Sequence, residues 1–264
     1  MAVLADKEII SLCTKPTHLV YDVNGTPTEL ISPPYTSEQM RLIKNWCNEN
    51  GRPYAVPLED VYNWKPVIDN FEPTPVRYVH KETGEGRTIV TEEELDQFKK
   101  VISYGVTSYG YDVRITNDIN EIKIFSNING RDIDPKRIVD DNFATPFIRE
   151  DEEGSQYVLI PPHSYLQAPT VEYFRIPKDI LVTVLGKSTY ARGGLVCNVT
   201  PIEPEFEGNV VIELANTTGS PVRCYLNEGI AQFVFIKGNT VCDYSYKDKG
   251  GKYQGQTGLT YAKV

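Results

Sequence analysis

The stretch ILVTVLGKSTYARGGLVCNVTPIEPEFEGNVVIELAN, residues 180–216, gives the clearest indication of the fold class of this chain. It contains three runs rich in β-branched residues, ILVTVL, LVCNV and NVVIELA, which begin at Ile180, Leu195 and Asn209. Turn-forming glycines and prolines lie between the runs, and this combination predicts short β-strands joined by turns. We therefore expect a core built from strands.

Runs of the same kind continue on both sides of this stretch. They are YDVRIT, EIKIF, QYVLI, PVRCYL and IAQFVFI. Together they predict a compact all-β sandwich or barrel, for example a jelly roll, over residues 103–244. Two capping-box patterns, at residues 36–39 and 91–94, predict helices that end near Gly51 and Phe98.

Composition and charge exclude several classes of protein. The chain has 264 residues, 40% hydrophobic and 24% charged, which is typical of a soluble globular protein with one main domain. Lys and Arg number 27 against 36 Asp and Glu, and the net charge of −9 argues against binding to nucleic acid or to an anionic membrane surface. The sequence shows no membrane-spanning run and no signal peptide, and its five scattered cysteines suit free thiols, so we expect a cytoplasmic protein.

The segment that follows the first run could hold an anion. A P-loop is excluded, because the glycine it requires five residues before Gly186 is Leu181 here. Lys187, Ser188, Thr189 and Arg192 nevertheless concentrate hydrogen-bond donors within six residues. Such donors suit a phosphate group, although an ordinary turn after a strand would also account for them.

A carboxylate is the best candidate for catalysis. The sequence has neither an H-x-E with a downstream C-x-x-C nor a G-x-S-x-G, so zinc hydrolysis and a serine triad lack support. In the third run Glu213 shares a strand face with Val211, while Val210, Ile212 and Leu214 share the other face. We expect Glu213 to be half-buried; from spacing alone a structural role is favoured, and a catalytic role stays open.

The glycine-rich segment 245–264 is too polar to build a core. It suits either a frayed end or a lid whose donors, Lys252, Tyr253, Gln254 and Gln256, close over a ligand.

Five segments together resemble one family. They are ISYGVTSYGYDVRI, PPHSYLQAPTVEYFRIP, LGKSTYARGGLVCNVTPIEPEFEGNVVIELANTT, NEGIAQFVFI and SYKDKGGKYQGQTG, at residues 102–115, 161–177, 185–218, 227–236 and 245–258. In this order they closely resemble the dCTP deaminases, the deaminating branch of the trimeric dUTPase superfamily. The resemblance covers residues 101–264 and, more loosely, residues 6–10 and 67–77.

The resemblance implies a mainly β fold, a distorted jelly roll or β-barrel of the trimeric dUTPase type, assembled as a homotrimer with shared active sites. A few short helices are expected, two of them in N-terminal insertions. The implied organisation is an atypical N-terminal segment at residues 1–100, a β core with the nucleotide site at residues 101–244 and a C-terminal lid at residues 245–264.

The implied activity is hydrolytic deamination of dCTP to dUTP and ammonia, which supplies dUMP and dTTP in a bacterial or phage-infected cell. The resemblance implies a zinc-free reaction, Mg²⁺ bound with the triphosphate, and dTTP as a candidate inhibitor. The implied catalytic residues are Glu213, Ser188 and Arg192. The implied substrate-binding residues are Lys187, Ser188, Thr189, Tyr190, Ala191, Arg192, Val211, Ile212, Glu213, Gln232, Tyr246, Lys252 and Gln256.

The chain also departs from the family pattern. Residues 19–66 and 78–97 lack a clear counterpart in the short members, and Phe206 and Cys197 replace a tryptophan and a valine that are common there. These departures leave open a preference for a modified cytosine. A bifunctional enzyme that also cleaves dUTP to dUMP, and a non-catalytic nucleotide-sensing interaction protein, are the alternative interpretations.

Overall fold

The computed structural model describes residues 1–13, 18–21, 27–31, 65–126, 130, 132–138, 140–198 and 200–263. The chain forms two compact units, one of Met1–Ile10 with Val67–Val264 and one of Ser11–Pro66. In the second unit, strands β2 (His18–Tyr21) and β3 (Pro27–Ile31) pair in antiparallel orientation. The helix predicted from the capping box at residues 36–39 lies outside the described residues.

The described part of the first unit contains an eight-stranded antiparallel sheet, here called the large sheet. Its order is β16-β14-β19-β8-β7-β5-β6, with β1 paired to β19. The strands are β1 (Ala2–Val3), β5 (Val76–His80), β6 (Gly86–Arg87), β7 (Phe98–Thr107), β8 (Gly110–Arg114), β14 (Ile180–Gly186), β16 (Pro201–Ile202) and β19 (Gly229–Lys237).

A second sheet, six-stranded within the described residues, has the order β10-β9-β13-β17-β15, with β4 paired to β13. Its strands are β4 (Ile68–Asp69), β9 (Lys123–Phe125), β10 (Phe143–Ala144), β13 (Tyr165–Arg175), β15 (Leu195–Cys197) and β17 (Glu207–Asn216). A small sheet consists of β11 (Arg149–Glu150), β12 (Gln156–Ile160) and β18 (Val222–Tyr225).

Helices are short in the described residues. They are α1 (Asp6–Cys13), α4 (Ser188–Arg192) and the 3-10 helices η1 (Glu92–Gln97), η2 (Ile119–Glu121) and η3 (Asp140–Asn142). None of the helices described here is long and apolar enough to cross a membrane. The predicted mainly β architecture with a few short helices is therefore confirmed.

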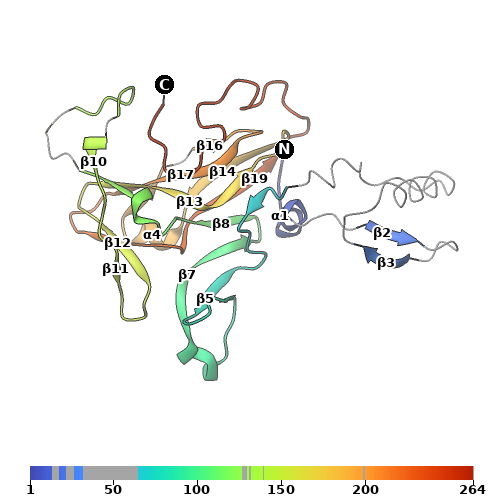
Figure 1. Cartoon of the computed structure of the whole chain (residues 1–264), viewed down its shortest axis with the longest axis horizontal. Coiled ribbons are helices and arrows are strands. Elements are labelled where there is room, and N and C mark those ends of the chain that lie inside the picture. Colours follow the sequence, from blue (N-terminus) through green and yellow to red (C-terminus); the bar gives the residue numbers. More distant parts are fainter. Residues whose placement is uncertain are drawn as a thin grey trace. The chain divides into compact units, whose positions relative to one another are not determined.

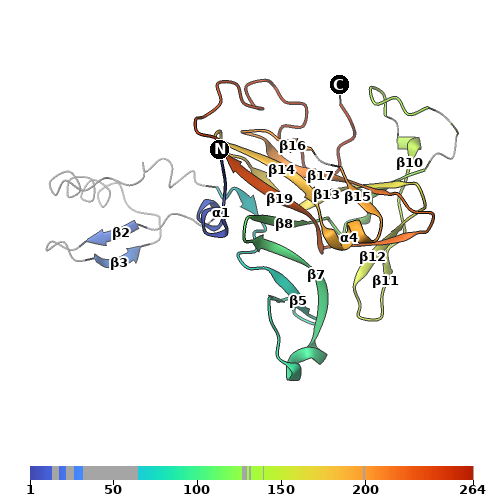
Figure 2. The same ribbon diagram turned by 180° about the vertical axis from the view of Figure 1, so that it is seen from behind.

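The main core lies where the large sheet and the second sheet face each other. Phe174 on β13 and Phe233 on β19 are both fully buried, and their ring centroids lie 5.0 Å apart. Figure 1 shows β13, β14, β17 and β19 together in the body of this unit. The paired strands β5 and β7 extend away from them, as the view from behind in Figure 2 also shows.

Each of the eight runs predicted as a strand contains one, but sequence reasoning missed β13, the longest strand described. Pro169 lies within β13 and lacks the N–H that a ladder needs, so the run did not look like a central strand. The register shifts between Pro169 and Tyr173, and this irregularity accommodates the proline. The helix predicted at residues 91–98 exists, but as the 3-10 helix η1, where the Glu94 carboxylate accepts a hydrogen bond from Thr91 N at 3.0 Å.

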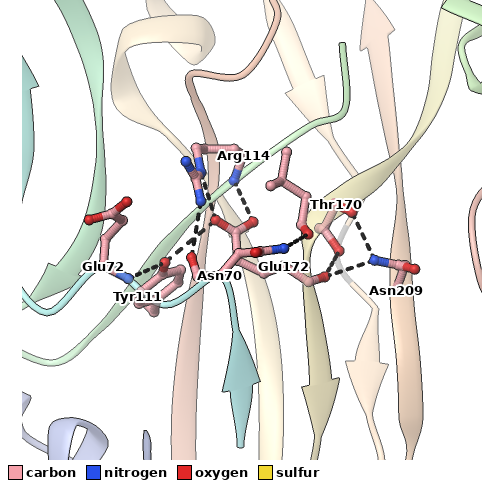
Figure 3. A network of polar contacts seen from close by, with 8 residues as sticks. Asn70, Glu72, Tyr111, Arg114, Thr170, Glu172 and Asn209 are labelled. Atoms are coloured by element: carbon pink, nitrogen blue, oxygen red, sulfur yellow. Dashed lines mark hydrogen bonds and ion pairs between the residues drawn. The ribbon is translucent and has the colours of Figure 1, made fainter. Parts of the chain in front are cut away.

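A buried ion pair joins the two sheets (Figure 3). The carboxylate of Glu172 on β13 accepts hydrogen bonds from Arg114 N at 3.0 Å and from Arg114 Nε at 2.9 Å. The guanidinium of Arg114, on β8, also donates to Asn70 O at 3.0 Å and lies over the ring of Tyr104. The Glu172 side chain has no exposed surface and that of Arg114 is 9% exposed. Both charges have lost their contact with water, and each is stabilised by the opposite charge of its partner.

Candidate active site

Strand β17 places Glu213 at the border between core and solvent. Val210, Ile212 and Leu214 are buried on one face, whereas Val211 and Glu213 are half-buried on the other. This alternation follows from the pleat of a strand, in which successive side chains leave on opposite faces. The predicted half-burial of Glu213 is confirmed.

Glu213 lines a pocket of about 410 Å³. Val211 from the same strand, and Tyr246 and Gln256 from the C-terminal segment, line it as well. The structure thus brings together four residues that the sequence placed in the site. A fifth lining residue, Gln167, is the Cα partner of Glu213 across β13 and β17. Gln167 lies on the missed strand, inside the segment 161–177 that resembles the family, but the sequence analysis gave it no role.

The environment of Glu213 favours its neutral form. Burial raises the pKa of the Glu213 carboxyl above its usual value, and among the described residues no basic side chain forms an ion pair with it. Cys197, a thiol on the neighbouring strand β15, has its pKa raised to about 12, first by burial and then by the charge of Glu213. A carboxyl group in such surroundings takes up a proton at a higher pH than an exposed glutamate does.

Main-chain contacts hold the C-terminal segment against β17. Gly255 N donates to Glu207 O at 2.7 Å, and Asn209 N donates to Gln256 O at 3.0 Å. Gly208 has a φ of +151°, and a Cβ there would lie 2.8 Å from Gln256 O. Only glycine permits this approach of the two chains, so Gly208 is required for the segment to reach the pocket.

The donor-rich turn predicted after β14 is the short helix α4. Tyr190 is buried, and its hydroxyl accepts a hydrogen bond from Tyr225 N at 3.0 Å, which fixes the helix on the small sheet. Ser188, Thr189 and Arg192 are exposed. Their side chains are therefore available to a ligand that approaches from solvent or from another chain.

Lys187 precedes α4 and is already paired. Its ammonium donates to the carboxylate of Asp112 on β8 and, at 3.4 Å, to Ser103 Oγ. The side chains of Lys187 and Asp112 are 11% and 10% exposed. Any anion bound by Lys187 must therefore share the ammonium with Asp112, a residue that motif reasoning did not single out.

The remaining predicted residues lie apart from the Glu213 pocket. Gln232 on β19 is the Cα partner of Asp112 and donates to Thr107 Oγ1 at 3.0 Å, so it belongs with Lys187 on the large sheet. Ile212 points into the core, and Lys252 is exposed and does not line the pocket. None of residues 187–192 lines this pocket. Apart from Ile212 and Lys252, the predicted residues thus form two groups within one chain, the Glu213 pocket and the α4 segment with Gln232.

Residues 78–238 match a family model described as dCTP deaminase-like. The chain belongs to the dCTP deaminase-like family. It is 52% identical over 166 residues to the dCTP deaminase of Helicobacter hepaticus, a match that covers 63% of this chain and 85% of the relative. It is 53% identical over 198 residues to that of Methylococcus capsulatus, which covers 75% of this chain and 91% of the relative.

Among solved structures, the chain is similar to the 2'-deoxycytidine 5'-triphosphate deaminase from Agrobacterium tumefaciens. The match covers 62% of this chain and 49% of that one, with a TM-score of 0.34 and 12% sequence identity. The dCTP deaminase-like match includes α4, Glu213 and Gln232 and ends before the C-terminal segment. Residues 78–97 fall inside the matched span and residues 19–66 fall outside it. That these two segments are insertions stays a prediction.

Proposed function

We propose that this chain deaminates dCTP to dUTP and ammonia, with Glu213 as the group that moves protons. The observation that carries the proposal is a half-buried carboxyl with a raised pKa and no ion-pair partner in the described residues, in a pocket of a dCTP deaminase-like chain. The position is also the one that the family resemblance assigns to the catalytic glutamate. The roles given to the other site residues rest on the same resemblance.

The chemistry requires one group to serve in turn as base and as acid. Water adds to C4 of cytosine as it loses a proton, and N3 takes up a proton, which gives a tetrahedral intermediate. The amino group then takes up a further proton and leaves as ammonia, while the new hydroxyl loses its proton to become the carbonyl of uracil. Glu213 takes a proton from water and passes it to N3, and then takes the proton of the new hydroxyl and passes it to the departing nitrogen. Ser188 and Arg192 position the water and the carboxyl.

The product analysis tests this function. We expect purified protein incubated with dCTP and Mg²⁺ to release ammonia and to accumulate dUTP in equal amounts, measured by anion-exchange chromatography. Accumulation of dUMP and pyrophosphate would instead identify the bifunctional reaction. dCTP that binds without release of ammonia would contradict the enzymatic proposal and favour a nucleotide sensor.

The separation of the two residue groups supports a shared site in a homotrimer. None of residues 187–192 lines the Glu213 pocket, yet Ser188 and Arg192 are exposed. Two apolar side chains on the strands that flank α4, Leu185 and Val196, are also 39% and 50% exposed. A neighbouring copy that covers these side chains would bring its α4 to the pocket and complete the site.

Mixing of two inactive variants tests the shared site. If each site takes α4 from one copy and Glu213 from another, a random reassembly of equal amounts of Arg192→Ala and Glu213→Gln chains leaves about one quarter of the sites intact. We expect ammonia release to recover to about that fraction of wild type. Each variant reassembled alone is the control. A mixture that stays as inactive as its components would place the whole site within one chain.

Mg²⁺ belongs to this proposal as a companion of the triphosphate. No group of three or more His, Cys, Asp or Glu side chains in the described residues could hold a metal ion. This fits a cation carried mainly by phosphate oxygens and water, which is how Mg²⁺ commonly binds at nucleotide sites. When bound it would neutralise phosphate charge beside Lys187. dTTP carries the same triphosphate and sugar, so we also propose that it competes for the site.

A further inference from the structure

Asn209 connects the core to the C-terminal segment through both its side chain and its main chain. Its Nδ2 donates to Thr170 O at 3.0 Å and to Glu172 O at 3.1 Å, at the irregularity of β13 (Figure 3). Because both amide hydrogens are taken by carbonyl oxygens, the orientation of the amide is fixed and Oδ1 faces away from β13. Oδ1 accepts a hydrogen bond from Gly258 N at 3.3 Å.

The main chain of Asn209 holds Gln256 at the edge of the pocket. Asn209 N donates to Gln256 O at 3.0 Å, and Asn209 O accepts from Gln256 Nε2 at 2.5 Å. The second bond uses the donor end of the Gln256 amide. Its Oε1 is buried and has no hydrogen-bond partner among the described residues. The side-chain amide of Gln256 therefore lines the pocket in a fixed orientation, and its Oε1 is left without a hydrogen-bond donor among the described residues.

The position of Asn209 is itself rigid. Val210 N, next in the chain, donates to Thr170 Oγ1 at 3.0 Å, and Thr170 Oγ1 donates to Glu172 O at 2.7 Å. The carboxylate of Glu172 is in turn held by Arg114. The polar network of the core therefore extends from Arg114 and Glu172 to Asn209, the residue that is hydrogen-bonded to Gln256.

We infer that Asn209 is a positioning residue that fastens the C-terminal segment over the pocket and sets the orientation of the Gln256 amide. This inference rests on the proposed function. A nucleotide that enters the pocket meets Gln256 as an acceptor, which suits an N–H donor such as the amino group of cytosine. Without the side-chain hydrogen bonds of Asn209, the C-terminal segment opens more often. Gln256 is then correctly placed for a smaller fraction of the time.

Asn216 offers a matched control on the same strand. Its Nδ2 donates to Ile160 O, Pro161 O and Ser220 O at 2.8–3.0 Å, and its side chain is buried. Within the described residues, its side chain makes no hydrogen bond to residues 245–263. Asn216→Ala therefore removes a comparable set of hydrogen bonds from β17 without touching the segment. A merely structural role for Asn209 predicts the same behaviour from both variants.

The experiment compares Asn209→Ala with Asn216→Ala and wild type by limited trypsin digestion, because Lys249 and Lys252 lie exposed in the segment. Cleavage of an opened segment tracks the open population. Asn209→Ala keeps the main-chain bonds to Gln256 but removes the side-chain bond to Gly258 N and the two bonds that hold Asn209 on β13. We expect its segment to be cleaved about tenfold faster, and kcat/KM for dCTP to fall by a similar factor. Asn216→Ala should lower the Tm without freeing the segment.

Two results would overturn the inference. One is a cleavage rate for Asn209→Ala within twofold of wild type, and the other is equal release of the segment in Asn216→Ala. Asn209→Leu, which keeps the size of the side chain, gives the same readout if the alanine variant folds poorly. Because cleavage is measured without turnover, a protein that fails to deaminate dCTP would contradict the proposed function and still leave Asn209 tested.

Discussion

Glu213→Gln should lower kcat for ammonia release from dCTP by about 10²–10⁴-fold or more, the range that general acid–base catalysis contributes. The substitution keeps the size of the side chain and its capacity for hydrogen bonds, so the affinity for dCTP should stay within a few fold of wild type. Turnover at saturating dCTP and calorimetric affinity separate the two effects. Turnover within a few fold of wild type would make the carboxylate structural.

Glu207→Gln is the matched control, because it makes the same chemical change on the same strand. Glu207 forms an ion pair with Arg175 at 3.4 Å, and its side chain does not line the Glu213 pocket. We expect its turnover to match wild type. A loss as large as that of Glu213→Gln would show that replacing either carboxylate of β17 disturbs the site, whether or not it lines the pocket.

The pH profile checks the same carboxyl independently. Burial raises the pKa of Glu213 above its usual value. Only the ionised form can accept a proton from water, so kcat/KM should fall as the pH drops through this raised pKa. The fall should therefore begin at a higher pH than for an exposed glutamate, and the residual activity of Glu213→Gln should lack it.

Glu172→Ala should lower the free energy of unfolding by about 3–5 kcal/mol, because it leaves the buried guanidinium of Arg114 without its partner. The carboxylate has no exposed surface and accepts two hydrogen bonds from Arg114 (Figure 3). Urea denaturation at one fixed protein concentration, with circular dichroism as the probe, measures the loss. A loss below about 1 kcal/mol would mean that water or a rearranged partner solvates Arg114.

Two further variants separate burial from pairing. Arg87→Ala breaks ion pairs with Glu85 at 3.0 Å and with Glu94 at 2.9 Å, which solvent screens, and should destabilise the protein far less than Glu172→Ala does. Replacing Arg114 and Glu172 together by methionine removes both charges and should cost less than Glu172→Ala alone, because no uncompensated charge is left in the core. A double variant as unstable as the single one would assign the loss to packing.

Local patterns were sufficient to locate eight of the nineteen described strands. The runs of β-branched residues and the turns between them are properties of neighbouring residues, and all eight predicted runs contain a strand. Period-two alternation on β17 also placed Glu213 on the half-buried face. Among the strands that were missed are β7 and β13, and β13 contains Pro169, whose missing N–H is tolerated because the register shifts beside it.

Eight strand positions, the face of Glu213 and the family to which the chain belongs follow from the sequence alone. Only the tertiary structure decided which side chains meet: Gln167 opposite Glu213, Lys187 on Asp112, and Gln256 on Asn209. Strand periodicity depends on neighbours two residues apart, so it can be read along the chain. Register and the seating of the C-terminal segment depend on groups that are distant in sequence, such as the glycine at position 208 that lets Gln256 approach. Contacts of that kind become fixed only when the sheets pack.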